Sequence, residues 1–474
     1  MKATARAADF LKEHVSEGGL FYVVSHLDAD GLAAAGVIGT ALARLDAKFC
    51  IRIERWIDEK VVKDATANES ALVTLCDMGS GEVSLLNAQL KNRRLVILDH
   101  HQPVGESDPD FLHVNPHVFG IDGSKDLSSA GIAYFVAKAM DKANMDLAAI
   151  AIVGALGDMQ DKYERRGLGG PNALILKDAE ANGCLKTEID LMFFGRETRP
   201  IHKALACTTT PFIAGLSGEE DRSLALLASL GITPKIGEKW RALRDLSEDE
   251  KRRLFNALTD YMMSRGLPSS SALNLRGNVY TLAHEEPWTP MRDAREFSVL
   301  LNATGRMNRS SLGIAICMGD REEALKEADS VLYEYRQTIT KYLNWIMEPN
   351  MDRIEELSSI YVVRGGDVID DKIIGTISSI LSTNLAKPEK PIIACSTVQS
   401  ENLAKVSARA IDAVVQKGLN LGEILRVAAE KYSGKGGGHN IAAGAQVPLG
   451  ALDSFISMVN DLVSEQLRPW KLGS

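Results

Sequence analysis

The sequence lacks several features that would place it in well-known protein classes. None of its apolar runs approaches the ~20 residues that a membrane-spanning helix needs. Its six cysteines contain no CxxC pair, so neither a disulfide scaffold nor a cysteine zinc site is expected. Residues 1–13 show no signal-peptide core, and we expect a cytoplasmic protein without a membrane partner.

The sequence also lacks an excess of positive charge. Lysine and arginine number 54 against 63 aspartate and glutamate residues, which gives a net charge of −9. Proteins that coat nucleic acid through bulk charge are usually basic. A nucleic-acid partner would therefore have to bind in a local basic groove, whereas an acidic balance suits carboxylates that hold cations.

The N-terminal part of the chain alternates strand-like and helix-like segments. An alanine-rich helix is predicted over residues 32–45, and residues 148–156 form an apolar run that periodicity cannot assign to a strand or a helix. Such alternation predicts an α/β fold with a parallel sheet covered by helices on both faces. The predicted strands are residues 21–25, 49–53, 71–76 and 95–98.

The rest of the chain changes character twice. Residues 218–267 are helical and charged in pattern, and the strand and helix alternation resumes after residue 351. The length suggests about three domains at a typical ~150 residues each. We place them at residues 1–215, 216–350 and 351–474.

The strongest local signal is the segment SHLDADG at residues 25–31. His26, Asp28 and Asp30 occupy alternate positions after the first predicted strand. Alternate side chains on an extended turn point the same way, so these three can converge on one cation, and Gly31 can open the following helix. The alternative interpretation is a solvated turn rich in aspartate.

Further acidic and histidine residues follow other predicted elements. Asp77 comes after the third strand, Asp158 ends the apolar run, and Asp99, His100 and His101 follow the fourth strand. Considered one at a time, each aspartate could be a helix cap instead of a metal ligand. The two histidines could likewise be loop residues without a function. Because ligands gather at the carboxyl ends of parallel strands, the positions together predict one site.

Aspartate and histidine without cysteine favour Mn²⁺ or Mg²⁺ over structural zinc. Two ions that share a bridging carboxylate can activate a water and stabilise the leaving oxygen of a phosphoryl transfer. The residues available for two ions are His26, Asp28, Asp30, Asp77, His100 and Asp158.

The order H-x-D-x-D, D, D-H-H and D resembles the DHH phosphoesterase superfamily. Residues 436–444, GGGHNIAAG, resemble the GGGH…AAG signature of its DHH-associated (DHHA1) domain. Within the superfamily the chain most resembles archaeal RecJ-like nucleases, including the GINS-associated nuclease, with support from residues 208–215 and 302–306. The resemblance implies a parallel-sheet DHH domain, a largely helical insertion with a linker helix, and a smaller α/β DHH-associated domain.

The resemblance also implies how the metal ligands are shared. His26 and Asp28 would hold one ion, and Asp77 would bridge this ion to a second. The remaining ligands of the second ion would be Asp30, His100 and Asp158. All ligand positions of the family are filled, which argues against a degenerate scaffold protein.

Two further residues of the DHH segment would act beside the metals. His101 would touch the scissile phosphate and stabilise charge there. Asp99 would orient a histidine rather than bind a metal ion.

In the C-terminal domain, the resemblance implies contacts with phosphates of the nucleic-acid backbone. Glycines let backbone N–H groups approach a phosphate without obstruction by a Cβ atom, and His439 would add a donor. Ser407 and Arg409 would hold another phosphate, the arginine through its fork of donors. The alternatives are a flexible loop and a solvated basic face. The glycines concerned are Gly436, Gly437 and Gly438.

These inferences predict a metal-dependent exonuclease specific for single strands, acting in DNA replication or repair on DNA, with RNA as a second candidate substrate. Cleavage should be largely sequence-neutral, because phosphate contacts carry no sequence information. One alternative is a non-enzymatic replisome scaffold that binds a GINS-like protein. Another is a phosphodiesterase that acts on dinucleotides or nanoRNA.

Overall fold

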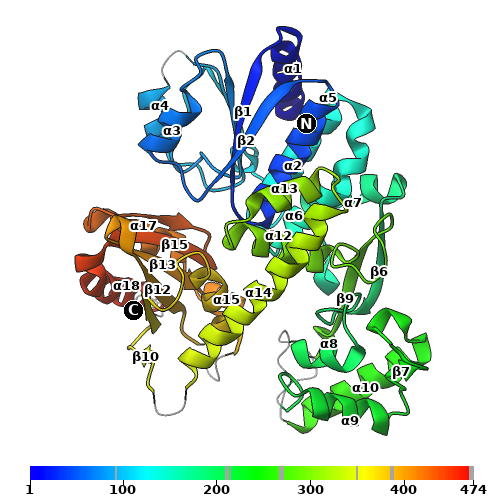
Figure 1. The fold of residues 1–474 in the computed structure, drawn as a ribbon. Helices are drawn as coiled ribbons and strands as arrows, with labels where there is room; N and C mark the ends of the chain where they lie inside the picture. Colours follow the sequence, from blue (N-terminus) through cyan, green and yellow to red (C-terminus); the bar gives the residue numbers. More distant parts are fainter. Residues whose placement is uncertain are drawn as a thin grey trace, which may run out of the picture. The chain divides into compact units, whose positions relative to one another are not determined.

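The computed structural model describes residues 1–90, 93–208, 213, 215–265, 272–348, 351–384 and 389–468 (Figure 1). The chain divides into two compact units, Met1–Leu332 and Tyr333–Ser474, each with its own main sheet. Within the described ranges, no helix has the length and hydropathy required to cross a membrane. The boundaries predicted for three domains stay a prediction.

A five-stranded parallel sheet forms the centre of the first unit. Its strands lie in the order β2-β1-β3-β4-β5, and every neighbouring pair is parallel. β3 and β4 are buried along their whole length, which explains why β4 is entirely aliphatic and why Thr74 is the one polar residue of β3. The four predicted strands are confirmed, and β5 is an addition. The bounds are β1 (Leu20–His26), β2 (Lys48–Glu54), β3 (Leu72–Cys76), β4 (Leu95–Leu98) and β5 (Phe111–Val114).

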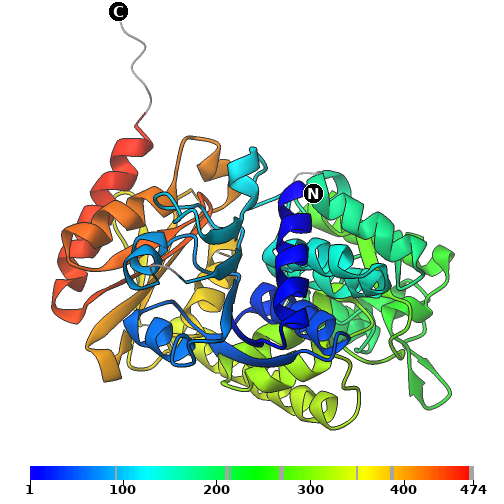
Figure 2. The same ribbon diagram turned by 90° about the horizontal axis from the view of Figure 1, so that it is seen from above.

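Helices cover both faces of this sheet, as an α/β fold requires. On one face, α3 (Glu59–Ala65) and α4 (Val83–Gln89) share an apolar core with the strands. On the other face, α5 (Ser129–Met140) packs against α1 (Lys2–Ser16) and α2 (Ala29–Ala43) (Figures 1 and 2). The predicted fold class is confirmed.

The apolar run that periodicity could not assign is a helix, α6 (Ala148–Gly157). It is buried on nearly all sides because it packs against α2, α5 and α7 (Gly170–Ala181). A Cβ atom at Gly154 would lie 2.5 Å from the Cβ of Ala130, and one at Gly157 would lie 2.6 Å from the Cβ of Ala29. The two glycines therefore permit the close approach of α6 to its neighbours.

The start of α2 differs from the prediction. The helix begins at Ala29, not near Leu32, because Asp28 is its N-cap and accepts a hydrogen bond of 3.0 Å from the Gly31 nitrogen. Gly31 therefore lies inside the first turn and does not open the helix. Asp30 projects from that helical turn. The predicted reason for its approach to His26 and Asp28, an extended segment with alternating side chains, is therefore wrong.

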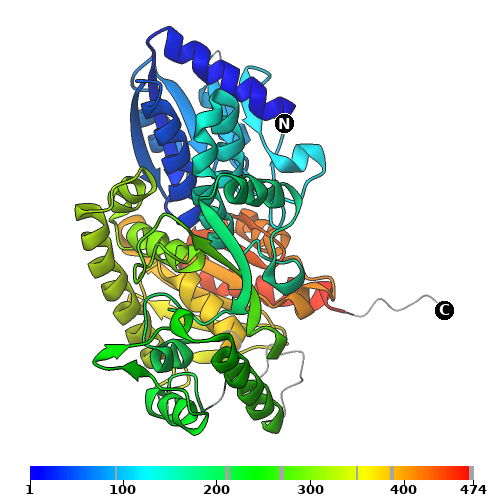
Figure 3. The same ribbon diagram turned by 90° about the vertical axis from the view of Figure 1, so that its right-hand side faces the viewer.

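From β6 to β9, the chain of the first unit lies outside the five-stranded sheet and its covering helices. Strand β6 (Leu185–Leu191) pairs with β9 (Arg276–Leu282) in an antiparallel ribbon (Figure 3). Between them, helices and one short hairpin enclose a separate apolar core. The bounds are α8 (Ile201–Cys207), α9 (Glu220–Ser229), β7 (Lys235–Ile236), β8 (Lys239–Trp240) and α10 (Glu248–Ser264).

After β9, the chain packs back against the sheet helices. Helix α12 (Ala294–Arg306) contacts α6 and α2, and α13 (Ser310–Cys317) contacts α2 (Figure 1). Phe297, Leu300 and Leu301 of α12 are fully buried. Part of the segment predicted as an insertion is therefore integral to the first unit. The long helix α14 (Glu323–Ile346) follows and crosses the division between the units.

The second unit contains a six-stranded sheet in the order β10-β11-β12-β13-β15-β14. Only β11 and β12 are parallel. Helix α15 (Ile374–Asn384) contacts β12 and β13, whereas α17 (Leu421–Lys431) contacts β14 and β15 and packs against α18 (Leu452–Gln466). The strands are β10 (Ile354–Glu356), β11 (Tyr361–Gly366), β12 (Ile392–Val398), β13 (Leu403–Arg409), β14 (Lys435–Gly438) and β15 (Ala442–Pro448).

The glycine run near the C-terminus is a strand and not a flexible loop. Gly436, Gly437 and Gly438 lie in β14 at the edge of the sheet and pair with β15. A Cβ atom at Gly436 would lie 2.5 Å from the Leu425 carbonyl oxygen of α17. Close packing of α17 on the strand therefore accounts for part of the glycine requirement.

Candidate metal centre

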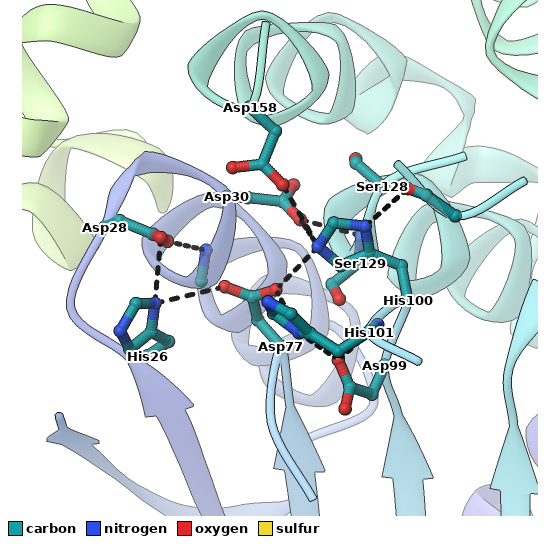
Figure 4. A network of polar contacts seen from close by, with 12 residues as sticks. His26, Asp28, Asp30, Asp77, Asp99, His100, His101, Ser128, Ser129 and Asp158 are labelled. Atoms are coloured by element: carbon teal, nitrogen blue, oxygen red, sulfur yellow. Dashed lines mark hydrogen bonds and ion pairs between the residues drawn. The ribbon is translucent and has the colours of Figure 1, made fainter. Parts of the chain in front are cut away.

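Histidine and aspartate side chains meet at the carboxyl ends of β1, β3 and β4 (Figure 4). His26 ends β1, Asp77 follows β3, and His100 lies two residues beyond β4. The strand order reverses between β1 and β3, which is where parallel α/β sheets open a crevice for ligands. The predicted location of the site at this edge therefore agrees with the topology.

One cluster of potential ligands surrounds His26. Its Nδ1 lies 2.8 Å from Asp28 Oδ2 and 3.5 Å from Asp77 Oδ2. One ligand atom from each of these three residues lies within 4.8 Å of the others, a separation that a metal ion could bridge. The structure thus brings together the set predicted for one ion.

A second cluster surrounds His100, on the other side of Asp77. His100 Nε2 lies 3.0 Å from Asp158 Oδ2, 3.3 Å from Asp77 Oδ1 and 3.9 Å from Asp30 Oδ2. Asp30, Asp77 and His100 again have ligand atoms within 4.8 Å of one another. Asp77 is therefore common to both clusters, with one oxygen toward each (Figure 4).

The environment of Asp77 fits a cation. Its side chain is buried, yet neither carboxylate oxygen accepts a well-formed hydrogen bond from the described residues. Its backbone φ of 60° lies in the left-handed region, which is uncommon for an aspartate and is typical of functional sites. A buried carboxylate in this position costs free energy unless a positive charge compensates it, and the oxygen and imidazole donors around it suit a hard divalent ion.

The charges in the two clusters are strongly coupled. Burial alone would lower the pKa of His26, but the Asp28 and Asp77 carboxylates raise it to about 10. Burial and the Asp158 and Asp77 carboxylates raise the pKa of Asp30 well above its usual value. Protons thus balance part of the negative charge that a metal ion would otherwise neutralise.

A hydrogen bond from Nδ1, on the side of the ring away from the carboxylates, fixes the orientation of His100. Its Nδ1 lies 2.6 Å from the Gly123 carbonyl oxygen, which also accepts a hydrogen bond of 2.8 Å from Gln160 Nε2. Asn172 in turn donates to Gln160 Oε1 at 2.6 Å. Donation from Nδ1 directs Nε2 of the ring toward the carboxylates, the tautomer that a metal ligand needs. Gln160 and Asn172 belong to no motif and were not predicted as site residues.

Asp99 contacts His101 and lies beneath it. Asp99 Oδ1 is 2.8 Å from His101 Nδ1, and Asp99 Oδ2 accepts a hydrogen bond of 2.9 Å from the Ser80 nitrogen. Both oxygens are thus engaged, which suits an orienting residue better than a metal ligand. Burial would lower the pKa of His101, but Asp99 raises it to about 9.

A polar network behind Asp99 was not predicted. Ser80 Oγ lies 2.8 Å from His113 Nε2 and accepts a hydrogen bond of 2.9 Å from Asn115 Nδ2. Asn115 Nδ2 also donates to the His101 carbonyl oxygen at 2.8 Å. His113 lies on β5 and Asn115 directly follows it, so a strand that the sequence did not reveal supplies this support.

Helix α12 contacts the loop that carries the first ligands. Asn302 Oδ1 accepts a hydrogen bond of 3.2 Å from the Ala29 nitrogen. A Cβ atom at Gly305 would overlap the Leu27 carbonyl oxygen, so only glycine permits this approach. Burial would raise the pKa of Asp28, but His26 lowers it, with a smaller contribution from Arg306. Residues 302–306 (NATGR) therefore support the loop that carries His26 and Asp28.

The second unit places the predicted phosphate-binding residues near one another on its sheet. Ser407 is buried on β13, with its Oγ 3.0 Å from Ser378 Oγ of α15. Arg409 donates to Ser407 Oγ at 3.2 Å and to Ser379 Oγ at 2.9 Å. His439 directly follows β14. The two serines of α15 were not predicted: Ser379 accepts from Arg409, and Ser378 contacts Ser407.

One supporting segment lies largely outside the described residues. Of residues 208–215, the structure describes only Thr208, Ile213 and Gly215. The Thr208 carbonyl accepts a hydrogen bond of 2.6 Å from Ser217 Oγ, a local contact without a bearing on the metal centre.

Three family models match successive parts of the chain. The DHH family N-terminal domain matches residues 20–155, the DHH-CID domain matches residues 193–275, and the DHHA1 domain matches residues 358–465. The middle match begins in the predicted DHH domain, includes the supporting residues 208–215, and extends into the segment that we predicted as an insertion.

Two relatives extend over nearly the whole chain. An uncharacterized protein of Methanocaldococcus jannaschii is 31% identical over 475 residues, or 99% of each chain. The single-stranded-DNA-specific exonuclease RecJ of Bacillus subtilis is 22% identical over 483 residues, which is 98% of this chain and 48% of RecJ. The present chain thus spans about half the length of that exonuclease.

Solved structures share the fold. RecJ from Thermus thermophilus in complex with Mn²⁺ matches with a TM-score of 0.59 and 17% identity, over 98% of this chain and 55% of that one. CDC45 from Entamoeba histolytica matches with a TM-score of 0.64 and 11% identity, over 97% and 99% of the two chains. The chain therefore belongs to the DHH family, as a RecJ-like member that carries the DHH, DHH-CID and DHHA1 domains in that order.

Proposed function

We propose that this protein is a metal-dependent exonuclease that hydrolyses phosphodiester bonds of single-stranded DNA or RNA. The observation that carries the proposal is Asp77, a buried carboxylate with one oxygen toward His26 and the other toward His100. This is the arrangement that two metal ions sharing one bridging ligand require.

The residues present are sufficient for two ions. His26 and Asp28 would hold one, Asp77 would be shared, and Asp30, His100 and Asp158 would complete the other. Mn²⁺ suits this mixture of imidazole and carboxylate donors, and Mg²⁺ suits its oxygen atoms. Such ions, when bound, would lower the pKa of a water molecule and neutralise charge on the transferring phosphoryl group.

His101 supplies a further positive charge beside the cluster. The Asp99 carboxylate keeps its imidazole protonated near neutral pH, with Nδ1 toward Asp99. His101 is 40% exposed, whereas Asp99 is buried, so the ring is accessible to a substrate while its orientation is fixed. A protonated imidazole in this position can donate a hydrogen bond to a phosphate oxygen and stabilise charge that develops there.

The activity and the metal ion named for two relatives support the proposal, although they describe those proteins and not this chain. The Bacillus relative is described as a single-stranded-DNA-specific exonuclease, and a structure of the Thermus protein contains Mn²⁺. All predicted ligands meet in one place here, which is the property that a hydrolase needs and a scaffold does not.

The test uses single-stranded DNA and RNA of one sequence, each labelled at one end and then at the other. The wild-type chain should release nucleotides from one end in Mn²⁺ or Mg²⁺, and none in EDTA. Asp77→Asn should abolish release because it removes the shared charge. Asp110→Asn, an exposed aspartate in the same sheet domain, is the matched control and should cleave at the wild-type rate.

A wild-type protein that cleaves no strand with either metal would overturn the proposal. That result would favour a scaffold role, and the CDC45 structure shows that the same fold occurs in another named protein. A GINS-like protein would then be the first candidate partner to test by co-purification. Cleavage of a dinucleotide but not of a longer strand would instead identify a small-substrate phosphodiesterase.

A further inference from the structure

The segment that directly follows α6 carries one ligand of the second metal cluster and a support for another. Asp158 ends the helix, and its Oδ2 lies 3.0 Å from His100 Nε2 (Figure 4). Two residues later, Gln160 donates a hydrogen bond to the Gly123 carbonyl oxygen, which also contacts His100 Nδ1. Both nitrogens of the His100 ring therefore have partners whose position depends on this segment.

The backbone of residues 158–167 has a conformation that its sequence does not favour. Met159 has a φ of 52°, at the position where helices commonly end in glycine. Arg165 and Arg166 have φ values of 54° and 57°. Side chains of these types rarely adopt the left-handed region, which persists only where the surrounding structure imposes it. Contacts from other elements must therefore hold this segment in place.

Asp161 ties the segment to helix α12. The residue is only 1% exposed, and its Oδ2 accepts two hydrogen bonds from Arg295, at 3.1 Å from Nε and 2.7 Å from Nη2. Its Oδ1 lies 3.0 Å from Arg166 Nη2, within the segment itself. A buried carboxylate is unfavourable without positive charge beside it, so the two guanidinium groups fix Asp161 in one position.

Arg295 is itself held by strand β9. Its Nη1 donates to the Asn278 carbonyl oxygen at 2.8 Å, and its guanidinium carbon lies 5.2 Å from the centroid of the Tyr280 ring. Asn278 Nδ2 also donates to the Arg165 carbonyl oxygen at 3.0 Å. The Tyr280 hydroxyl donates to the Arg166 carbonyl oxygen at 3.2 Å. Strand β9 and helix α12 thus grip the same segment together.

We propose that the ion pair between Asp161 and Arg295 positions Asp158 and His100 for the second metal ion. Neither side chain of the pair would touch the ion or the substrate. The pair sets the place of the segment that carries one ligand and supports the other. This inference rests on the proposed function and adds two positioning residues to its metal centre. Residues in such a supporting position change metal affinity by roughly 10- to 100-fold when they are replaced.

Helix α12 would then position ligands of both metal ions. Arg295, in its first turn, holds the segment of Asp158. Asn302 and Gly305, in its last turns, contact the loop that carries the first two ligands. One helix that contacts both ligand segments would keep the two ions at a fixed separation, as a shared bridging carboxylate requires.

The test measures Mn²⁺ binding to the full chain by calorimetry, with one site weakened at a time. Asp28→Asn weakens the first site and leaves the second to be measured, and Asp30→Asn does the reverse. In the Asp28→Asn chain, addition of Arg295→Gln should weaken the remaining Mn²⁺ binding by about 10- to 100-fold. In the Asp30→Asn chain, the same addition should leave the remaining binding unchanged.

A conservative variant and a matched control separate positioning from folding. Arg295→Lys keeps a positive charge beside Asp161 but loses the contact from two nitrogens, so it should recover part of the lost affinity. Arg321→Gln breaks another ion pair of the first unit, in which Arg321 Nη2 lies 2.7 Å from Glu285 Oε1. It should lower the thermal unfolding midpoint in EDTA and yet leave Mn²⁺ binding at both sites unchanged.

Two results would overturn the inference. One is wild-type Mn²⁺ binding at the second site in a folded Arg295→Gln chain, and the other is equal weakening of both sites. Should Arg295→Gln not fold, Arg295→Lys carries the test, because a smaller loss confined to the second site is still expected.

Cleavage by the wild-type chain separates failure of this inference from failure of the proposed function. If the wild type cleaves strands and the Arg295 variants bind both ions as the wild type does, the positioning role is wrong and the nuclease stands. If the second site depends on Arg295 but the wild type cleaves no strand, the nuclease is wrong and the positioning role stands. A wild-type chain that binds no Mn²⁺ would overturn both.

Discussion

Asp30 Oδ2 accepts a hydrogen bond of 2.7 Å from the backbone nitrogen of Ser129, in the first turn of α5. The neighbouring Ala130 nitrogen donates to Asp30 Oδ1 at 3.1 Å. The helix N-terminus therefore fixes the orientation of a carboxylate that is fully buried and lies near two others, Asp77 and Asp158. The N-terminus of α5 thus orients the Asp30 carboxylate, whereas burial and the two neighbouring carboxylates make its ionisation unfavourable.

Asp30→Asn should raise the thermal unfolding midpoint of the metal-free protein. The folded-state pKa of Asp30 is raised by burial and by the Asp158 and Asp77 carboxylates, so near neutral pH its ionised form is less favourable in the folded than in the unfolded chain. Asparagine keeps an oxygen for the Ser129 nitrogen but loses the acceptor of the Ala130 nitrogen, and we expect this cost to be smaller than the gain from removing a buried charge beside two carboxylates. Differential scanning fluorimetry in EDTA measures the effect, and addition of Mn²⁺ should stabilise the wild type far more than the variant.

Asp28→Asn is the contrasting variant and should act in the opposite direction. Burial would raise the pKa of Asp28, but His26 lowers it, so the ionised carboxylate stabilises the folded chain at neutral pH and this stability is lost as the group is protonated. Neutralising it should cost about 1–3 kcal/mol in unfolding free energy. Equal shifts of the same sign in both variants would contradict the assignment of charges.

Metal binding should release protons. Burial alone would lower the pKa of His100, but Asp158 and Asp77 raise it well above its usual value, and the pKa of His26 is raised to about 10. A metal ion must displace protons held by these imidazoles, so the affinity for Mn²⁺ should increase as the pH rises from about 6 to about 9. Calorimetry in buffers of different ionisation enthalpy counts the protons. A count of zero at neutral pH would show that the site is already deprotonated.

Asp99→Asn should move the alkaline limb of the cleavage profile to lower pH. Asp99 outweighs the effect of burial and raises the pKa of His101 to about 9, so the protonated ring should lose its proton near that pH in the wild type. Removal of the charge should shift the limb downward by about 1–3 units. Cleavage rates measured at several pH values test this. Ser80→Ala is the control and should keep the wild-type limb, because its backbone nitrogen still donates to Asp99.

Gly305→Ala should reduce activity although no ligand is changed. Its Cβ atom would overlap the Leu27 carbonyl oxygen and displace the loop that carries His26 and Asp28. We expect a loss of about 1–3 kcal/mol in stability and a higher Mn²⁺ requirement for cleavage. Gly450→Ala is the control, and an unchanged metal requirement in Gly305→Ala would show that α12 does not support the loop.

Asn302→Ala tests the same contact by deletion. It removes the acceptor of the Ala29 nitrogen at the start of α2, which should cost about 0.5–1.5 kcal/mol and raise the metal requirement less than the glycine variant does. Metal titrations of cleavage measure the order of the two effects. A larger effect of Asn302→Ala would place the main support in the hydrogen bond and not in the packing.

The sequence sufficed for the parts of the site that follow strands directly. His26, Asp77 and His100 come after apolar runs that form β1, β3 and β4, and parallel strands necessarily end at one edge. The left-handed backbone of Asp77 could not be predicted, because nothing in the sequence specifies a positive φ at a non-glycine residue.

The supporting residues escaped prediction for a different reason. Ser80, Asn115 and Gln160 act through contacts between segments that are remote in sequence, and their types are common in loops. The glycine run was interpreted as a phosphate-binding segment, with a flexible loop as the alternative, and its strand was not predicted because glycine is depleted in strands. Its pairing as β14 depends on the close approach of α17, which only the folded unit reveals.

The return of α12 to the sheet helices makes the packed core around the DHH sheet discontinuous in the chain. A fragment that ends at residue 215 would contain every side chain of the metal cluster, yet it would expose the apolar sides of α2 and α6 to water. It would also lack the glycine contact that holds the Leu27 carbonyl in place. A fragment that keeps α2 and α6 covered must therefore extend through α12.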